Sequence, residues 1–365
     1  MKPRPATLGG SQVQRLVILR HEGKNVVSAM INTLTGFPIL KEGSVRLAPL
    51  AALRDLAVRH RLPLAERLDD PECTATFAEV GHLLNALIDS TGLEHVALMV
   101  SSSATLDSLG PIGALARGAR DVGSALRGLI LALHLHDRVT VATLAVGAGR
   151  ATLGTVALGL SGVEGAAPIA DLTMVACFNI LRELCGPEWR PQEIHLARRA
   201  PRDPRPWTSL FRVPPIFDAE RNALVFDMAW LNQPVAPGRE AVGTASLEWV
   251  VSLNPLDLPA RVRRLCVRAI IEGNPTVDRV AALCAVSRRT LNRQLAALDT
   301  TAQAELVAVK LAIAKQLLEG TSLSMTEIGH LLGYTDGSAF TRAFRIAEGI
   351  APSRWRPRSG RPEVL

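Results

Sequence analysis

The stretch TVDRVAALCAVSRRTLNRQL, residues 276–295, decides the fold of this chain, because residues 324–348, SMTEIGHLLGYTDGSAFTRAFRIAE, repeat its pattern. Each copy predicts a short helix, a tight turn and a second helix. In the first copy Ser287 is placed to cap the second helix. In the second copy Ser324 and Glu327 have the spacing of a capping box, and Gly333 stands at the turn. The sequence therefore predicts two helix-turn-helix units.

A single helix is predicted between the two units. Residues 302–318 carry an apolar stripe at helical spacing, and a helix of this length measures ~25 Å at 1.5 Å per residue. Beyond it, either Thr335 or Asp336 is placed to cap a helix over residues 337–348, whose buried side holds Phe340 and Phe344. A connecting helix of this length can set two recognition helices one turn of DNA apart, about 34 Å. One monomer would then read two adjacent major grooves.

The charge of the chain is concentrated in this region. Residues 1–257 hold 25 Lys and Arg against 25 Asp and Glu, whereas residues 258–365 hold 16 against 9, which accounts for the whole net charge of +7. A neutral body joined to a basic C-terminal third is the distribution expected when one domain binds a polyanion. The 48% apolar content is typical of globular domains, and the length suggests about two of them.

Residues 258–358 resemble the DNA-binding domain of the AraC/XylS family. The resemblance is carried by residues 328–345 and by GIAPSRWR at residues 349–356, in which the turn glycine, the paired Phe residues and the terminal Pro-Ser-x-x-Arg agree with the family signature. Arginine can bond guanine with two hydrogen bonds and asparagine can bond adenine, whereas phosphate contacts position the protein without specifying sequence. The resemblance implies base contacts by Arg289, Asn292, Arg293, Ser338, Thr341 and Arg342, and phosphate contacts by Arg288, Arg345, Arg354 and Arg356.

Two residues depart from the family pattern. Ala285 stands at the first turn, where the family commonly has glycine, so this turn is expected to be either slightly strained or differently shaped. Gly337 stands where a polar side chain is common, and the corresponding groove contact is expected to be missing.

The region before residue 240 predicts an α+β domain. Helical periodicity covers residues 45–93, 112–135 and 167–184. A β-hairpin is expected over 139–146 and 151–158, and two further strands over 193–198 and 222–226. The predicted order is an uncertain extension over 1–44, an α+β domain over 45–240, a linker over 241–257, an all-α domain over 258–358, and a tail over 359–365.

Residues 45–235 resemble, more loosely, the effector-binding domain of an AraC subclass that includes ornithine-catabolism and virulence regulators. The matching stretches are RPQEIHL at 190–196, IFDAERNALVFD at 216–227 and WLNQP at 230–234. The resemblance implies a small-molecule effector and homodimerisation. The residues themselves identify no ligand site: His134 and His136 cannot share a helical face, so no metal is expected, and no cofactor motif is present.

We interpret the chain as a sequence-specific, effector-responsive transcription activator without enzymatic activity. Its expected partners are double-stranded promoter DNA and RNA polymerase. Without a signal peptide or a membrane span in the sequence, and with five unpaired cysteines, a cytoplasmic location and no membrane partner are expected.

Two other classes remain open. One is a DNA repair or modification protein that uses a reactive cysteine, for which Cys73 is the candidate, although its acidic neighbours disfavour a thiolate. The other is an architectural protein that binds DNA without sequence preference; its affinity would depend on salt alone.

Overall fold

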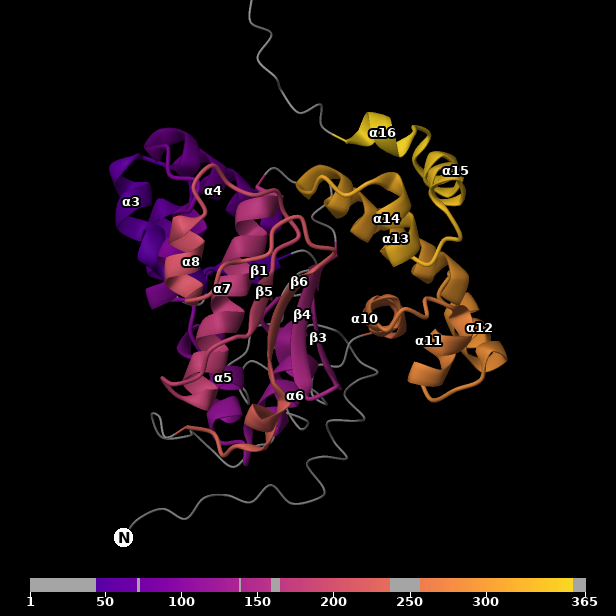
Figure 1. Cartoon of the computed structure of the whole chain (residues 1–365), viewed down its shortest axis with the longest axis horizontal. Helices are drawn as coiled ribbons and strands as arrows, with labels where there is room; N and C mark the ends of the chain where they lie inside the picture. Colours follow the sequence, from indigo (N-terminus) through magenta and orange to yellow (C-terminus); the bar gives the residue numbers. More distant parts are fainter. Residues whose placement is uncertain (1–43, 71–72, 138, 159–164, 237–256, 357–365) are drawn as a thin grey trace, which may run out of the picture.

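The computed structural model describes residues 44–70, 73–137, 139–158, 165–236 and 257–356. They form an α+β unit followed by an all-helical unit, as predicted (Figure 1). The predicted extension, linker and tail fall almost wholly on residues outside these ranges. Ser44, assigned to the extension, is the first residue of a strand, and Asp257, assigned to the linker, caps the first helix of the all-helical unit.

The α+β unit is built around a four-stranded antiparallel sheet of order β3-β4-β6-β5. A second, two-stranded sheet pairs β1 with β2. The strands are β1 (Ser44–Arg46), β2 (Thr74–Thr76), β3 (Thr140–Gly147), β4 (Arg150–Ala157), β5 (Glu193–His195) and β6 (Asn222–Asp227). The α-helices are α3 (Arg54–Arg59), α4 (Phe77–Thr91), α5 (Pro111–Arg117), α6 (Val122–Ala132), α7 (Ala166–Cys185) and α8 (Arg205–Phe211). Short 3-10 helices join them: η2 (Ala48–Leu53), η3 (Ala65–Asp69), η4 (Val96–Ser102), η5 (Asp107–Leu109), η6 (Leu133–Leu135) and η7 (Met228–Asn232).

Most of these elements were predicted, with three differences. The β1–β2 pairing was missed, because each strand has only three residues and gains its partner from 30 residues away. The helical stretch predicted over 112–135 is broken into α5 and α6, and Asp121 caps α6 by accepting a hydrogen bond from the backbone N–H of Ser124 at 2.7 Å. Helix α8 lies between the strands predicted over 193–198 and 222–226, where no helix was predicted, and Pro in its first turn starts the helix instead of ending it.

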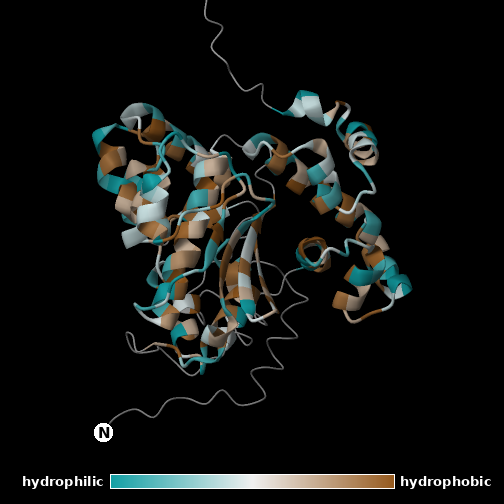
Figure 2. Ribbon diagram, viewed as in Figure 1, coloured by the Kyte–Doolittle hydropathy of each residue, from teal (hydrophilic) through white to brown (hydrophobic). Residues whose placement is uncertain are grey.

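The core of the α+β unit lies between helix α7 and the sheet. Phe178 of α7 meets Trp189 and Phe211 with ring centroids 5.7 and 5.3 Å apart, and Trp189 meets Phe226 of β6 at 5.8 Å. All four rings are at most 1% exposed. Figure 2 shows apolar residues along the helices and strands of this layer. Burial of large aromatic side chains contributes strongly to the stability of such a core.

The all-helical unit contains seven helices in the described residues 257–356. They are α10 (Leu258–Ile271), α11 (Val277–Leu283), α12 (Arg288–Ala296), α13 (Ala302–Gly320), α14 (Met325–Leu331), α15 (Gly337–Glu348) and α16 (Pro352–Trp355). The long helix α13 lies between the pair α11–α12 and the pair α14–α15 (Figure 1).

In the described ranges, no single helix has both the length and the apolar character needed to span a membrane. Helices α4 and η4 reach that composition only as a pair, and they meet at a bend of 109°.

Candidate nucleic-acid interface and ligand cavity

The first helix-turn-helix unit is fixed by two caps and a small core. Ser287 accepts a hydrogen bond from the backbone N–H of Thr290 at 3.1 Å, as predicted, so α12 begins at Arg288. Leu291 of α12 is fully buried against the domain core. Ala285 at the turn has φ of 56°, a left-handed conformation that an alanine adopts at a cost. The strain expected from the sequence is therefore present.

The second unit begins with the predicted capping box. The N–H of Glu327 donates to Ser324 Oγ at 3.2 Å, and the N–H of Ser324 donates to Glu327 Oε2 at 2.7 Å. Asp336, not Thr335, caps α15, because its Oδ1 accepts from the N–H of Ala339 at 2.7 Å. At the turn Gly333 has φ of 76°.

Gly337, the second departure from the family pattern, has a packing role. A Cβ atom at this position would lie 2.9 Å from Thr326 Oγ1 and 3.2 Å from the Cα of Thr326. Contacts this short are tighter than most Cβ contacts in folded proteins, so a larger residue at the start of α15 would require Thr326 and α14 to shift by a few tenths of an ångström.

Three side-chain contacts hold the other helices on α13. Glu305, 5% exposed, accepts a hydrogen bond from Arg263 of α10 at 2.6 Å. At the other end of α13, Lys315 pairs with Glu348 of α15 at 2.7 Å and stacks 4.5 Å from the ring centroid of Trp355 in α16. Its 19 residues make α13 ~28 Å long. The connecting helix thus fixes the separation of the two units.

The predicted base-contacting residues of α12 differ in their surroundings. Arg289 and Arg293 are exposed and form no hydrogen bond or ion pair within the described part of the chain. Asn292 is half-buried, and its side-chain oxygen accepts a hydrogen bond from the N–H of Ala302 at 3.1 Å. The structure therefore gives Asn292 a role in joining α12 to the start of α13, which reduces its capacity to form the paired bonds that adenine needs.

On α15 the predicted base-contacting residues share one helical face. Ser338 and Arg342 are exposed, and neither has a side-chain partner among the described residues. Thr341 is half-buried, and its hydroxyl donates to the carbonyl of Gly337 at 2.7 Å. The methyl group of Thr341 and the second lone pair of its hydroxyl oxygen remain available to contact a base.

Three of the four predicted phosphate-contacting arginines lie at the surface. Arg288, Arg345 and Arg354 are exposed, and only Arg288 has a charged neighbour within the described residues, Asp278 at 3.5 Å. Arg356 differs, because its guanidinium donates to the carbonyl of Leu323 and is partly buried.

Burial, and secondarily the charge of Arg199, lower the pKa of Arg356. This arginine ties α16 to the start of the second unit. The side chain of Arg356 thus lies partly inside the fold, and not among the exposed arginines.

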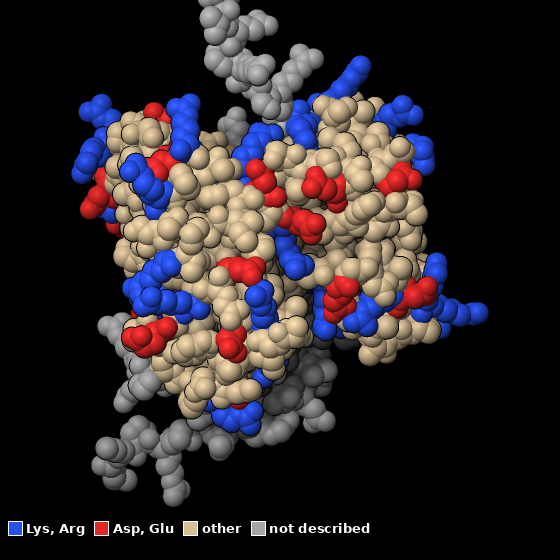
Figure 3. All heavy atoms as spheres, in the orientation of Figure 1, with Lys and Arg blue, Asp and Glu red and all other residues tan. Residues whose placement is uncertain are grey.

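Helices α12 and α15 lie away from the sheet of the α+β unit. In Figure 1 they are at the outer edge of the all-helical unit, with α13 between them and the α+β unit. Figure 3 shows Lys and Arg side chains along this margin, at the level of α15 and α16 and again at the level of α12.

The α+β unit contains a cavity of about 120 Å³ between the sheet and helices α4, α6 and α7. Its walls are apolar over most of their extent, and they include Leu126 and Leu129 of α6, Leu153 of β4 and Leu172, Ala176 and Ile180 of α7. A few polar residues, among them Arg46, His136 and Thr140, line it as well.

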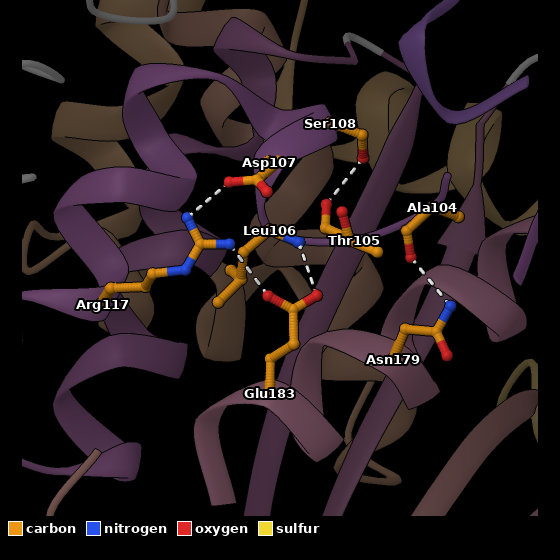
Figure 4. A network of polar contacts seen from close by, with 8 residues as sticks. All are labelled: Ala104, Thr105, Leu106, Asp107, Ser108, Arg117, Asn179 and Glu183. Atoms are coloured by element: carbon orange, nitrogen blue, oxygen red, sulfur yellow. Dashed lines mark hydrogen bonds and ion pairs between the residues drawn. The ribbon is translucent and has the colours of Figure 1, made fainter. Parts of the chain in front are cut away.

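A partly buried polar network lies behind one wall of the cavity (Figure 4). Glu183 of α7 accepts from the N–H of Leu106 at 3.1 Å and from Arg117 at 2.9 Å, and Arg117 also pairs with Asp107 at 2.7 Å. Asn179, one turn earlier on α7, donates to the carbonyl of Ala104 at 3.0 Å. The segment that follows, including Ser108 and Leu109, lines the cavity.

The outer face of the same sheet packs on the all-helical unit. Val141 of β3 and Val156 of β4 lie opposite each other in the ladder and join the hydrophobic core of α10 and α13. Because side chains alternate along a strand, their neighbours Thr140 and Thr155 point to the other face and line the cavity. A single layer of sheet therefore separates the cavity from helices α10 and α13.

Hydrogen bonds from the end of α13 complete this contact. The N–H of Arg199 donates to the carbonyl of Gly320 at 2.6 Å, and the N–H of Ser322 donates to Asp218 Oδ1 at 2.8 Å. Gln316 of α13 also donates its side-chain amide to the carbonyl of Ala157.

The cavity and this contact were not identified from the sequence. The sequence offered two faint signals, a charged Arg46 within an apolar run and a histidine, His136, at the end of an apolar helix. Neither indicates a common site, since 90 residues of chain separate them.

Comparison with known proteins agrees with these two units. Residues 51–235 match the family described as the arabinose-binding domain of AraC transcription regulator, and residues 280–358 match a helix-turn-helix domain family. The chain is 28% identical over 300 residues to the ornithine utilization regulator of Pseudomonas aeruginosa, a match that covers 80% of this chain and 87% of that protein. It is 23% identical over 321 residues to the transcriptional regulator VirS of Mycobacterium tuberculosis, with 82% and 91% covered.

Among solved structures, the chain matches the crystal structure of the transcriptional regulator CdpR from Pseudomonas aeruginosa. It is 20% identical, with a TM-score of 0.42, and the match covers 84% of this chain and 97% of that one. The first family model spans half of the chain, and the second covers most of the two helix-turn-helix units. The chain belongs to the AraC family of DNA-binding transcription regulators, with an effector-binding domain of the type found in the ornithine utilization regulator.

Proposed function

We propose that this regulator reads two successive major grooves with α12 and α15 and activates transcription in response to an effector bound in the α+β unit. The observation that carries the proposal is the exposure of Arg289, Arg293 and Arg342 on two helices that α13 joins rigidly. An arginine whose guanidinium has no partner in the folded protein can bond guanine O6 and N7 without first breaking an ion pair. Ser338 and Thr341 supply further groove contacts on α15, and Asn292 supplies its amide nitrogen, while its side-chain oxygen already accepts one hydrogen bond from Ala302.

Phosphate contacts are assigned to Arg288, Arg345 and Arg354 at the margins of the two units. Their charges would position the helices on the duplex and make the affinity depend on salt. Arg356, for which the family resemblance implies the same role, is assigned to the internal contact with Leu323 instead.

The effector response is proposed to pass through the sheet. Thr140 and Thr155 line the cavity, while Val141 and Val156 on the other face contact α10 and α13. A ligand that fits only one arrangement of β3 and β4 would favour one orientation of the helices over others. RNA polymerase and a second copy of the chain are the proposed protein partners, and the proposed place of action is the bacterial cytoplasm.

We propose that the protein acts without catalysis. Burial raises the pKa of Cys177, Cys185 and Cys266 to about 12, and it also raises the pKa of Cys284, so these thiols are poor nucleophiles at neutral pH. Cys73 is half-buried and packs against the core of the α+β unit. A repair reaction at Cys73 predicts methyl transfer to its thiol, which mass spectrometry after exposure to methylated DNA would detect.

The test of DNA reading is selection of bound duplexes from a random pool by the full-length protein. The expected result is a motif with two blocks centred one helical turn apart. Arg293→Ala should relax one block, and Arg342→Ala should relax the other, each costing about 1–3 kcal/mol of discrimination at one base pair.

Arg354→Ala is the matched control, because loss of a phosphate contact weakens binding to all sequences about equally. If the wild-type protein selects no motif, it binds as an architectural protein and the proposal is wrong. If all three variants weaken binding uniformly, the assigned groove contacts are wrong.

A further inference from the structure

The cavity of the α+β unit has walls that favour a hydrocarbon ligand. Its volume of about 120 Å³ is close to that of an engineered apolar cavity of about 150 Å³ that binds benzene. Apolar side chains from α4, α6, β4 and α7 form most of its surface. A ligand that fills this space must itself be mostly hydrocarbon, because an unpaired buried polar group is costly.

Three hydroxyl groups of the cavity lining already donate within the protein. The hydroxyl of Ser108 donates to the carbonyl of Thr105 at 2.7 Å, and that of Thr173 donates to a backbone carbonyl one turn earlier on α7 at 3.0 Å. The hydroxyl of Thr155 is directed at the sulfur of Met174, 3.8 Å away. The protons of these three groups are therefore not available to a ligand.

The charged groups at the polar end of the cavity do not select an ionised ligand. Val45 of β1 forms a β-bridge with Asp137, which brings Arg46 and His136 to neighbouring places at the start of β3. Arg46 already has an interaction partner within the fold, and Asp137 places a carboxyl group at the same end. Backbone N–H groups of the turn before β3 donate to that carboxyl group at 2.6 and 3.0 Å. No unbalanced charge therefore remains among the described residues of the lining.

His136 presents a polar atom that has no partner. Its side chain lines the cavity and is 6% exposed, and its Nδ1 atom is buried without a hydrogen bond to any described residue. Burial, and then the nearby charge of Arg46, lower the pKa of His136 to about 3, so the imidazole is neutral. The Nδ1 atom of a neutral imidazole accepts a hydrogen bond from a hydroxyl group in one tautomer and donates one to a carbonyl oxygen in the other. A ligand with one such oxygen would satisfy this atom.

We propose that the effector is an uncharged, largely hydrocarbon molecule with one hydroxyl or carbonyl group, which binds with that group at His136 and with its hydrocarbon part between α6, α7 and the sheet. This inference rests on the proposed effector response only in naming the ligand an effector; the binding itself is separate. A sugar does not fit such a site, although the family description refers to arabinose, because each of its hydroxyl groups would need a partner. A carboxylate does not fit either, since no free positive charge would offset its loss of water.

The experiment is titration calorimetry of the full-length protein with four one-ring probes of similar size: 1-phenylethanol, acetophenone, ethylbenzene and benzoate. Saturable binding of the alcohol or the ketone is expected, at least about 10-fold tighter than that of benzoate, because only benzoate buries a charge. The stronger of the two neutral oxygen probes shows whether Nδ1 accepts or donates. L-arabinose and L-ornithine are the polar controls and should not bind.

Three results would overturn the proposal. The first is benzoate binding as tightly as the alcohol and the ketone, which would mean that a free positive charge faces the cavity. The second is saturable binding of L-arabinose or L-ornithine, which would mean that the lining offers several polar partners. The third is the absence of binding by both neutral oxygen probes.

Variants locate the binding in the cavity. His136→Leu removes Nδ1 and should weaken the binding of the alcohol or ketone about 10-fold while leaving that of ethylbenzene within about 2-fold, because only the hydrogen bond is lost. Ala176→Phe should abolish the binding of all probes by filling the cavity. His82→Leu, at an exposed histidine of α4 outside the lining, is the matched control and should change nothing. The comparison of neutral probes with benzoate in the wild-type protein stands even if His136→Leu does not fold.

DNA selection with and without the bound probe separates this proposal from the proposed function. Specific DNA binding by a protein that binds neither neutral oxygen probe would overturn the ligand class alone. Probe binding without any change in DNA affinity or transcription would leave the ligand class intact and overturn the effector response.

Discussion

Exchanging the residues at the two helix-turn-helix turns should change stability in opposite directions. Ala285 and Gly333 both have positive φ, 56° and 76°. The left-handed region costs a residue with a Cβ ~1–2 kcal/mol and costs glycine almost nothing. Ala285→Gly therefore removes strain, and Gly333→Ala introduces it.

The magnitudes differ because the two sites are packed differently. In Ala285→Gly the relief is partly offset by the greater freedom of glycine in the unfolded chain, ~0.4–1 kcal/mol, which leaves a net gain of about 0.5–1 kcal/mol. In Gly333→Ala the new Cβ would lie 2.3 Å from Cγ of Pro275, a rigid ring that must move. Overpacking of this kind costs ~1–3 kcal/mol, so the total loss should be about 2–4 kcal/mol.

Native-state hydrogen exchange on the full-length protein measures these changes locally. Ala285→Gly should increase the protection of α11 and α12, whereas Gly333→Ala should decrease that of α14 and α15. Because Pro275 precedes α11, Gly333→Ala should also reduce protection at the start of α11.

The matched control is Gly349→Ala, at the end of α15. Gly349 also has φ of 76°, but nothing lies within 4 Å of the position of its Cβ, so only the net conformational cost of ~0.5–1 kcal/mol worked out for Ala285 should appear. If Gly333→Ala costs no more than Gly349→Ala, the contact with Pro275 does not explain the glycine. If Ala285→Gly is destabilising, the strain at the first turn has been misjudged.

Three further predictions concern charged groups. Asp121→Ala should cost about 1 kcal/mol at pH 7 through the lost cap of α6. Hydrogen bonds to Ser124 lower the pKa of Asp121 from 3.8 to about 2, so the difference from wild type in urea unfolding should fade as pH drops from 4 to 2; a constant difference would contradict this. Glu305→Gln should lower the melting temperature by the equivalent of about 2 kcal/mol, since its partner Arg263 is only partly exposed, and Arg263→Gln should not add to that loss in the double variant. Lys315→Met should loosen the end of α15 by about 1 kcal/mol in hydrogen exchange, and a similar loss with Glu348→Gln, non-additive in the double variant, would identify the ion pair as the cause.

The helical half of this protein could be predicted closely because its signals are local. Ser287, Ser324 and Glu327 make their capping bonds within three residues, so sequence spacing alone specifies them. The strain at Ala285 could also be inferred, since a single position in a known motif requires a positive φ.

The DNA-contacting residues stay predictions, and for two of them the structure adds contacts within the fold. The sequence pattern groups Asn292 and Arg356 with exposed residues. Such a pattern shows which face of a helix a residue lies on, but not which residues pack against that face. Only the packing of the domain shows that Asn292 bonds the start of α13 and that Arg356 bonds the carbonyl of Leu323.

The sequence by itself determined the two helix-turn-helix units and the basic C-terminal third, because caps, turns and helical stripes are encoded within a few residues of one another. The tertiary structure alone decided the cavity and its contact with the DNA-binding unit. Arg46 and His136 are brought together by a strand pairing across 90 residues, and the faces of β3 and β4 acquire different neighbours only when α7 and α13 pack on opposite sides. Such pairings depend on the packing of the whole chain, which no local pattern records.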